Sequence, residues 1–274
     1  MEPATSRIVV KFGTGILTRL EGNTLDIPQF RRLTGEIGEA IRAGHQCILV
    51  SSGAVGAGMM VLGYQQRPTE LPAIQACAAV GQTRLMRLYQ SLFARHRLHV
   101  AQLLLTHQDM DSRTRRANAR NTLETLLSRG DTLPIINEND SVAVEELKFS
   151  DNDQLSADVA ILAQADQLII CTSANGLTRS GDPNDDPIAE VTDLEAARAL
   201  AQASHGPLSV GGMTTKLTAV GTALAQGITT RIINGRDAGS LSKALRNDPV
   251  GTKFYPAETT SAMQTASQPS FYDN

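Results

Sequence analysis

The chain has 274 residues, of which 41% are hydrophobic and 19% are charged, which is enough apolar material to bury a large core. Its 25 Lys and Arg residues against 28 Asp and Glu give a formal net charge of -3. This balance lacks the basic excess that binding to a nucleic-acid backbone requires. The composition also excludes a low-complexity linker, a fibre and a repeat array.

No segment predicts export or insertion into a membrane. The first residues, MEPATSR, contain no positive region followed by an apolar stretch, and no run of about eighteen apolar residues occurs. Cys47, Cys77 and Cys171 lie far apart in apolar stretches, a pattern typical of buried thiols in a reducing compartment. We therefore expect a cytoplasmic protein with neither a membrane nor a nucleic acid as partner.

Short runs rich in β-branched residues predict buried parallel strands. They cover residues 8–12, 47–50, 99–105, 133–136, 167–172 and 229–233. Helical periodicity lies between them, over residues 28–43, 74–92, 155–162 and 213–227. Pro28 opens the first of these helices, and Gly44 and Gly227 close the first and the last.

The alternation of strands and helices predicts an α/β sandwich with a mainly parallel sheet, in which ligands bind beyond the carboxyl ends of the strands. We expect one domain over residues 1–256. Residues 257–274 show no periodicity, and we expect them to form a polar, mobile tail.

Two common nucleotide-binding fingerprints are missing. The sequence has no G-x-x-x-x-G-K-[ST] loop, and Gly13-Thr14-Gly15 lacks the third glycine of G-x-G-x-x-G. His96 and His99 are the only closely spaced histidines, and no nearby cysteine or carboxylate set completes a zinc site. We expect ordinary, partly exposed histidines and no metal held by protein ligands alone.

Three turns rich in glycine and hydroxyl groups follow strands instead. They span residues 11–15, 51–58 and 211–216, and the last of them opens a helix. Glycine amides, helix N-termini and neighbouring lysines together make anion sites. Tight chain reversal explains any one of these turns, but three at the same edge of a sheet predict a polyphosphate ligand.

A fourth loop is rich in carboxylates and amides. Asn137-Glu138-Asn139-Asp140 follows a strand, and Asp151-Asn152-Asp153 opens a helix. Helix capping explains Asp151 or Asp153, whereas the first group fits recognition of the charged groups of an amino acid. A metal site competes with this interpretation, although in phosphoryl transfer Mg²⁺ usually comes bound to the nucleotide.

Five motifs in chain order resemble the glutamate 5-kinase family of the amino acid kinase superfamily. They are IVVKFGTG, LVSSGAVGAG, PIINENDSVA, FSDNDQLSADVA and GGMTTK, and they cover nearly the whole chain before the tail. The resemblance implies an αβα sandwich that uses ATP, with Mg²⁺ carried on the nucleotide, to phosphorylate the side-chain carboxylate of L-glutamate as the first step toward proline.

The resemblance also implies a homo-oligomer (dimer or tetramer), feedback inhibition by proline, and a glutamyl-phosphate reductase that receives the labile product. Many members add a C-terminal PUA-type domain, which we expect this chain to lack.

The resemblance assigns roles to individual residues. It implies that Lys11 and Lys216 are catalytic lysines and that Asp153 orients them. The glutamate contacts that it implies are Ser52, Asn137, Asp140 and Asn152. The nucleotide contacts that it implies are Lys11, Gly13, Thr172, Ser173, Val210, Gly211, Gly212, Met213, Thr214, Thr215 and Lys216.

Three positions depart from the family's pattern. Gly15 stands where serine is usual, Ser173 where aspartate is usual, and Val210 where threonine is usual. They concern the affinity for the nucleotide and the recognition of its base or ribose. Because they leave both lysines and Asp153 intact, we expect the chemistry to survive.

Lysines suit this reaction because of its charges. A carboxylate acceptor is already ionised near neutrality and needs no general base, but it must approach a polyanion. Lys11 and Lys216 can stabilise the transferring group from two sides. For Lys11 the alternative is a strand-end lysine with a buried stem. Lys216 is expected in the first turn of a helix, where the dipole disfavours a cation, so an anionic partner explains it better than solvent does.

Other interpretations remain open at this point. One is a different amino acid kinase, such as an acetylglutamate kinase, and another is a weakened kinase fold that senses glutamate or proline. Asp140 favours free glutamate, since its carboxylate would pair with an α-ammonium but not with a neutral amide, unless it only caps a turn. Arg113, Arg116 and Arg120 share a helix face, which we expect to be solvated or to lie between subunits.

Overall fold

One mixed sheet runs through the part of the chain that the computed structural model describes, residues 5–19, 24–142, 152–203 and 212–256. Eight strands of these residues form it, in the order β3-β4-β2-β1-β5-β7-β8-β6. The strands are β1 (Arg7–Phe12), β2 (Gln46–Ser51), β3 (His99–Leu105), β4 (Thr132–Glu138), β5 (Gln167–Thr172), β6 (Glu190–Val191), β7 (Thr229–Asn234) and β8 (Thr252–Phe254). Every neighbouring pair is parallel except β7 and β8.

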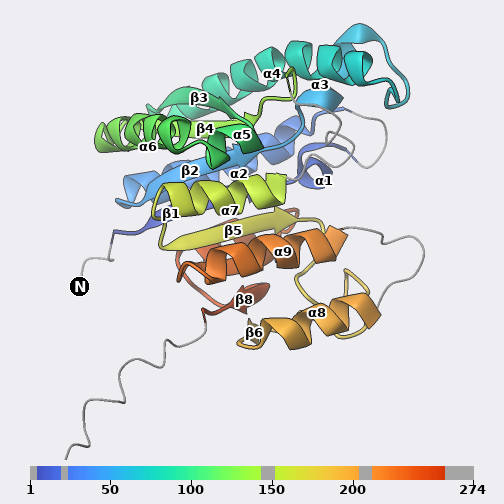
Figure 1. Cartoon of the computed structure of the whole chain (residues 1–274), viewed down its shortest axis with the longest axis vertical. Helices are drawn as coiled ribbons and strands as arrows, with labels where there is room; N and C mark the ends of the chain where they lie inside the picture. The colour runs from blue at the N-terminus through green and yellow to red at the C-terminus, as the bar shows by residue number, and fades with distance from the viewer. Residues whose placement is uncertain (1–4, 20–23, 143–151, 204–211, 257–274) are drawn as a thin grey trace, which may run out of the picture.

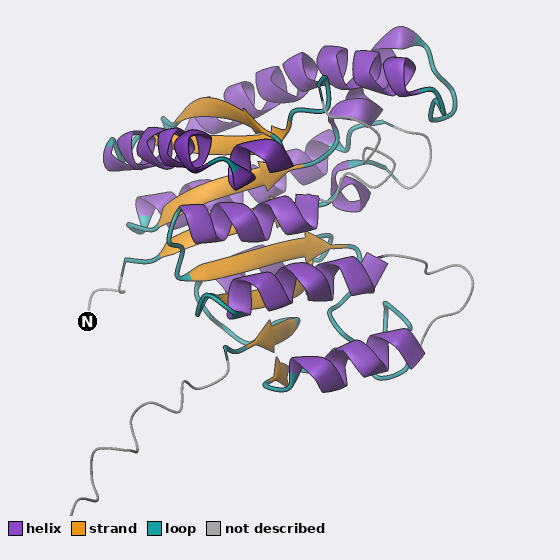
Figure 2. Ribbon diagram, viewed as in Figure 1, coloured by secondary structure: helices purple, strands orange, loops and turns teal. Residues whose placement is uncertain are grey.

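Helices cover both faces of the sheet and make three layers (Figures 1 and 2). They are α1 (Thr14–Leu17), α2 (Ile27–Arg42), α3 (Ala54–Leu62), α4 (Leu71–Phe93), α5 (His107–Asp111), α6 (Arg113–Ser128), α7 (Asn152–Leu162), α8 (Leu194–Ala203), α9 (Gly212–Leu224) and α10 (Ser240–Leu245), with a 3₁₀ turn at Ala94–His96. Alternate strand residues feed two cores. Val9 faces the core under α6, α7, α8 and α9, whereas Ile8 and Val10 face the core under α1, α2, α4 and α10. The expected sandwich is confirmed.

The predicted elements agree closely with the observed ones. All six predicted strands occur, although β3 lies at the edge of the sheet and only Leu105 of it is buried, whereas a buried strand was expected. The four predicted helices also occur and correspond to α2, α4, α7 and α9. The strands β6 and β8 were not predicted. They have two and three residues, which are too few to show the alternation of apolar and polar residues that marks a strand. The three cysteines are free and buried, as expected. The expected tail, residues 257–274, lies outside the described residues.

The segment after β2 differs from the expectation. Residues 51–58 were expected to form a turn, but only Ser52 and Gly53 do so, and α3 begins at Ala54. Gly53 has a φ of 103°, a left-handed conformation that glycine adopts without strain and that turns the chain sharply into the helix.

Gly58 of this segment and Gly81 on α4 serve helix packing. A β-carbon at Gly58 would lie 1.8 Å from the Cys77 carbonyl oxygen, and one at Gly81 would lie 1.7 Å from the Ala54 carbonyl oxygen. The backbones of α3 and α4 therefore touch where they cross, and no side chain fits between them. None of the described helices is long and apolar enough to cross a membrane.

Candidate active site

Lys11, Asp153 and Lys216 come together at the carboxyl edge of the sheet. Lys11 lies near the end of β1, Asp153 in the first turn of α7, and Lys216 in α9. Lys11 Nζ is 2.5 Å from Asp153 Oδ1, and Lys216 Nζ is 3.1 Å from Asp153 Oδ2. Residues far apart in the chain thus place two ammonium groups on one carboxylate, as expected of an aspartate that orients two lysines.

The Asp153 carboxyl is buried and stays ionised. The exposed side-chain fractions are 7% for Lys11, 3% for Asp153 and 14% for Lys216. Burial alone would raise the pKa of the Asp153 carboxyl, but the two ammonium groups outweigh burial and hold this pKa below its usual value. At neutral pH the carboxylate is therefore ionised and cannot donate a proton, so it suits a positioning role.

The position of Lys216 differs in one respect from the expectation. Because α9 begins at Gly212, Lys216 lies in the second turn of the helix rather than in its first. The dipole argument for an anionic partner is correspondingly weaker. The ammonium nevertheless reaches back toward the helix start, where it donates a hydrogen bond to the Gly212 carbonyl oxygen over 2.8 Å.

Glycine-containing loops lie beside the lysines. A β-carbon at Gly13 would lie 3.4 Å from Lys11 Nζ, and the Gly13 N–H donates to the Cys171 carbonyl oxygen over 3.3 Å. A β-carbon at Gly15 would lie 3.8 Å from Ser173 Oγ. The segment after β1 therefore adjoins the loop after β5, which begins at Ser173. Two of the three departures from the family's pattern, Gly15 and Ser173, are neighbours in space.

A chain of side-chain amides extends from the lysines toward α4. Asn152 Nδ2 donates to Ser52 Oγ over 2.9 Å and to Asn137 Oδ1 over 3.1 Å. Asn137 Nδ2 in turn donates to Gln82 Oε1 over 2.9 Å. Asn152, Asn137 and Gln82 are buried, and among the described residues Asn152 Oδ1 and Gln82 Nε2 lack hydrogen-bond partners. Buried amide groups left in this way point to a polar ligand or water.

Gln82 is a residue that the sequence did not single out. Gln82 lies on the buried face of α4. In the sequence it is a single polar residue within an amphipathic helical pattern, and nothing near it marks a site. Its partner Asn137 lies 55 residues away, and only the fold joins them.

Asp140 lies on an open cavity beside this amide chain. The cavity, of about 260 Å³, is lined by Ala54, Ala78, Ala79, Gln82, Thr83, Gln102, Leu104, Glu138, Asn139, Asp140 and Ser141. The Asp140 side chain is buried, and its Oδ1 has no hydrogen-bond partner among the described residues. Burial and the nearby Glu138 carboxylate raise the pKa of Asp140 to about 7, although Arg67 acts in the opposite direction. A cationic ligand group in the cavity would relieve this penalty.

The structure thus brings most of the candidate residues to one region. Gly212, Met213, Thr214 and Thr215 begin α9 next to Lys216, whereas Val210 and Gly211 lie outside the described residues. Within the described ranges, no three His, Cys, Asp or Glu side chains are grouped so that they could hold a metal ion. On the arginine face of α6, Arg113 and Arg116 are exposed, and Arg120 donates from Nε to the Leu162 carbonyl oxygen over 3.1 Å.

Solved structures of low identity share this fold. Carbamate kinase from Giardia lamblia bound to AMP-PNP superposes with a TM-score of 0.64 at 18% identity, covering 92% of this chain and 99% of that chain. N-acetylglutamate synthase from Neisseria gonorrhoeae, complexed with coenzyme A and L-arginine, gives a TM-score of 0.62 at 15% identity, covering 92% of this chain and 61% of that chain. At these identities the similarity shows the fold alone.

Sequence comparison goes further. The model of the amino acid kinase family matches residues 6–234. Glutamate 5-kinase from Pelobacter propionicus is 45% identical over 258 residues, which cover 92% of this chain and 68% of that protein. Glutamate 5-kinase from Aromatoleum aromaticum is 42% identical over 267 residues, covering 96% of this chain and 71% of that protein. The chain therefore belongs to the amino acid kinase family, on the branch that contains the glutamate 5-kinases.

Proposed function

We propose that this protein transfers the γ-phosphoryl group of ATP to the side-chain carboxylate of L-glutamate, giving L-glutamyl 5-phosphate, the first step of proline biosynthesis. The observation that carries the proposal is the pair of lysines that share the buried Asp153 carboxylate. The glutamate 5-kinases at 42% and 45% identity support the choice of substrate.

The reaction needs positioning and charge rather than proton transfer. One carboxylate oxygen of glutamate forms a bond to the γ-phosphorus while the bond from that phosphorus to the bridging oxygen breaks and ADP leaves. The acceptor is ionised at neutral pH, so no proton moves in this step. Lys11 and Lys216 place two positive charges where negative charge spreads over the transferring group, and Asp153 holds both in place.

The acceptor half of the site is assigned to the amide chain and Asp140. We assign the α-ammonium of glutamate to the Asp140 carboxylate, because the buried Oδ1 atom of this group has no hydrogen-bond partner among the described residues. Ser52, Asn137 and Asn152 offer the hydroxyl and amide groups that fix the rest of the amino acid. An acetylated amino group would leave the Asp140 charge unpaired.

The nucleotide half is assigned to Gly13, Thr172, Ser173 and residues 210–216, with Lys11 and Lys216 at the phosphates. The neighbouring loops after β1 and β5 support this assignment. Mg²⁺ enters on the nucleotide, where phosphate oxygens provide its ligands.

The cellular setting is proposed on the resemblance and on composition. The reaction takes place in the cytoplasm, in a homo-oligomer that proline inhibits. A glutamyl-phosphate reductase receives the acyl phosphate, which is labile in water. The three reduced cysteines fit a reducing compartment.

Trapping the product tests the proposal. The protein is incubated with ATP, Mg²⁺ and hydroxylamine, with glutamate, acetylglutamate or aspartate in parallel, and the hydroxamate is measured. We expect hydroxamate with glutamate alone. Product with acetylglutamate instead would identify a different amino acid kinase. Binding of glutamate without turnover of ATP would identify a sensing module.

A further inference from the structure

Three loops meet at the carboxyl ends of β1, β5 and β7. The Gly235 N–H, after β7, donates to the Thr172 carbonyl oxygen over 2.8 Å. Asn234 Nδ2 donates to Asn175 Oδ1 over 2.9 Å. A β-carbon at Gly235 would lie 2.8 Å from Ile16 Cδ1 and 3.0 Å from Cys171 Cβ, so this backbone is pressed against both neighbouring segments. The loop after β7 therefore contacts both loops that we assign to the nucleotide.

Arg236 ties this loop to the segment after β1. Its Nη2 donates to the Gly15 carbonyl oxygen over 2.5 Å and to the Thr18 carbonyl oxygen over 2.7 Å. Both carbonyls belong to the last turn of α1 and its end, where the chain has no regular partner for them. One guanidinium thus closes the end of α1, and its positive charge suits the carbonyl end of a helical turn.

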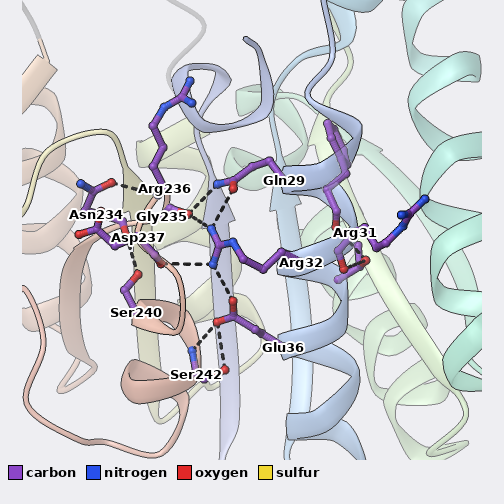
Figure 3. A network of polar contacts seen from close by, with 12 residues as sticks. Gln29, Arg31, Arg32, Glu36, Asn234, Gly235, Arg236, Asp237, Ser240 and Ser242 are labelled. Carbon is purple, nitrogen blue, oxygen red and sulfur yellow. Dashed lines mark hydrogen bonds and ion pairs between the residues drawn. The ribbon is translucent and has the colours of Figure 1, made fainter. Parts of the chain in front are cut away.

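Side chains of α2 hold the backbone of the loop after β7, next to Arg236 (Figure 3). Gln29 Nε2 on α2 donates to the Gly235 carbonyl oxygen over 2.7 Å, and Arg32 donates to the same oxygen. Glu36 accepts from Arg32 Nη1 over 2.6 Å and from the Ser242 N–H over 2.7 Å. The anchoring groups lie on α2 and α10, away from the lysines.

We propose that Arg236 is a positioning residue for residues 13–18, the short loop and helix α1 that follow β1 on the proposed nucleotide side. Its two hydrogen bonds hold the far end of this segment, and the near end carries Gly13 against the Lys11 ammonium. Loss of the guanidinium lets the segment move and weakens the nucleotide site, while the acceptor site, on the other side of β1, stays intact. The proposal rests on the proposed function for its kinetic part only.

The test compares Arg236→Met, Arg236→Lys and Arg246→Met with the unaltered protein. Arg246 is the matched control, because it pairs with Asp248 at the surface and its side chain is 63% exposed. For Arg236→Met we expect the KM for ATP to rise about tenfold and the KM for glutamate to stay within about twofold. Arg236→Lys, which keeps a cation able to reach a carbonyl, should recover part of the ATP KM. Arg246→Met should match the unaltered protein.

Hydrogen–deuterium exchange gives a readout that does not depend on activity. Without ligands, the peptide spanning residues 13–18 should exchange at least about threefold faster in Arg236→Met than in the unaltered protein or in Arg246→Met. Unchanged exchange in this peptide, or equal rises in both KM values, would overturn the proposal. If Arg236→Met fails to fold, the same comparison is made with Arg236→Gln, which keeps one donor. An unaltered protein without kinase activity would refute the proposed function, and the exchange result would still decide the role of Arg236.

Discussion

Ionisation of Asp140 should control glutamate binding and make it depend on pH. The pKa of this buried carboxyl is raised to about 7 by burial and by Glu138. In the proposed assignment, the α-ammonium of glutamate pairs with the ionised form only, so we expect binding to lower the pKa of Asp140 and to release a proton below pH 7. A carboxyl with this pKa is about nine-tenths ionised at pH 8 and about one-tenth ionised at pH 6. The KM for glutamate should therefore rise about tenfold from pH 8 to pH 6.

Asp140→Asn removes the charge and nearly preserves the shape. We expect its KM for glutamate to be raised at least about tenfold at pH 8, because a neutral amide does not offset burial of the ammonium. The value at pH 6 should then equal the value at pH 8. Initial rates of ADP formation at saturating ATP and varied glutamate give both numbers. Calorimetry in two buffers of different ionisation enthalpy counts the released protons.

Glu138→Gln is the matched control for this mechanism. Burial and the Glu138 carboxylate both raise the pKa of Asp140. Neutralising Glu138 should therefore move the midpoint of the plot of glutamate KM against pH to lower pH and leave the shape of the plot unchanged. An unaltered protein whose KM for glutamate is flat between pH 6 and pH 8 would contradict the reasoning. So would an Asp140→Asn variant that keeps the pH dependence or whose KM stays within about twofold at pH 8. The ammonium would then be bound elsewhere.

Three further predictions follow from other parts of the site and the core. Lys216→Ala should lower kcat at least about 10²-fold, with a smaller change in the KM for glutamate; an unchanged kcat in steady-state assays would leave Lys216 as a positioned but non-catalytic lysine. Gln82→Leu should raise the KM for glutamate about tenfold at a constant KM for ATP, because it leaves the buried Asn137 amide without an acceptor; a constant KM for glutamate would remove Gln82 from the site. Gly58→Ala should destabilise the fold by about 1–3 kcal/mol, because its methyl group would clash with the α4 backbone. Gly56→Ala on the same helix places its methyl group in open space and should stabilise the fold by about 0.5–1 kcal/mol. Equal melting temperatures for the two variants would contradict backbone contact between α3 and α4.

The sheet was predictable because buried parallel strands are continuously apolar. Runs such as residues 8–12 and 167–172 are mostly apolar and are buried on both faces, so their local signal survives without knowledge of their neighbours. The place of the site was predictable in part. In a parallel sheet the loops at the carboxyl ends meet at one edge, which predicts the place of Lys11. Lys216 lies on α9, which follows α8 rather than a strand of the described chain, and the family resemblance was what paired it with Lys11.

The helix α3 was not predictable from local signals. Gly53, Gly56 and Gly58 lower helix propensity and are typical of a turn. Contact with the α4 backbone explains Gly58, and that contact exists only in the folded molecule. The turn of α9 that holds Lys216 could not be predicted either. Two consecutive glycines, residues 211 and 212, precede it, and the sequence does not decide at which residue the helix begins. Gln82 was missed because its role depends on Asn137, on another element.

The start of α7 joins the two halves of the site. Asn152 and Asp153 are adjacent in sequence, yet Asn152 binds Ser52 and Asn137 on the acceptor side, while Asp153 binds both lysines on the phosphate side. The order β4-β2-β1-β5-β7 explains this division, because β1 lies between the strands that carry the acceptor residues and those that carry the nucleotide loops. In the proposed assignment, a single helical turn lies between the two substrates. We therefore expect a shift of this turn to move both substrates together, and changes at Gln82 or Arg236 to act on one half alone, so that the ratio of the two KM values separates their roles.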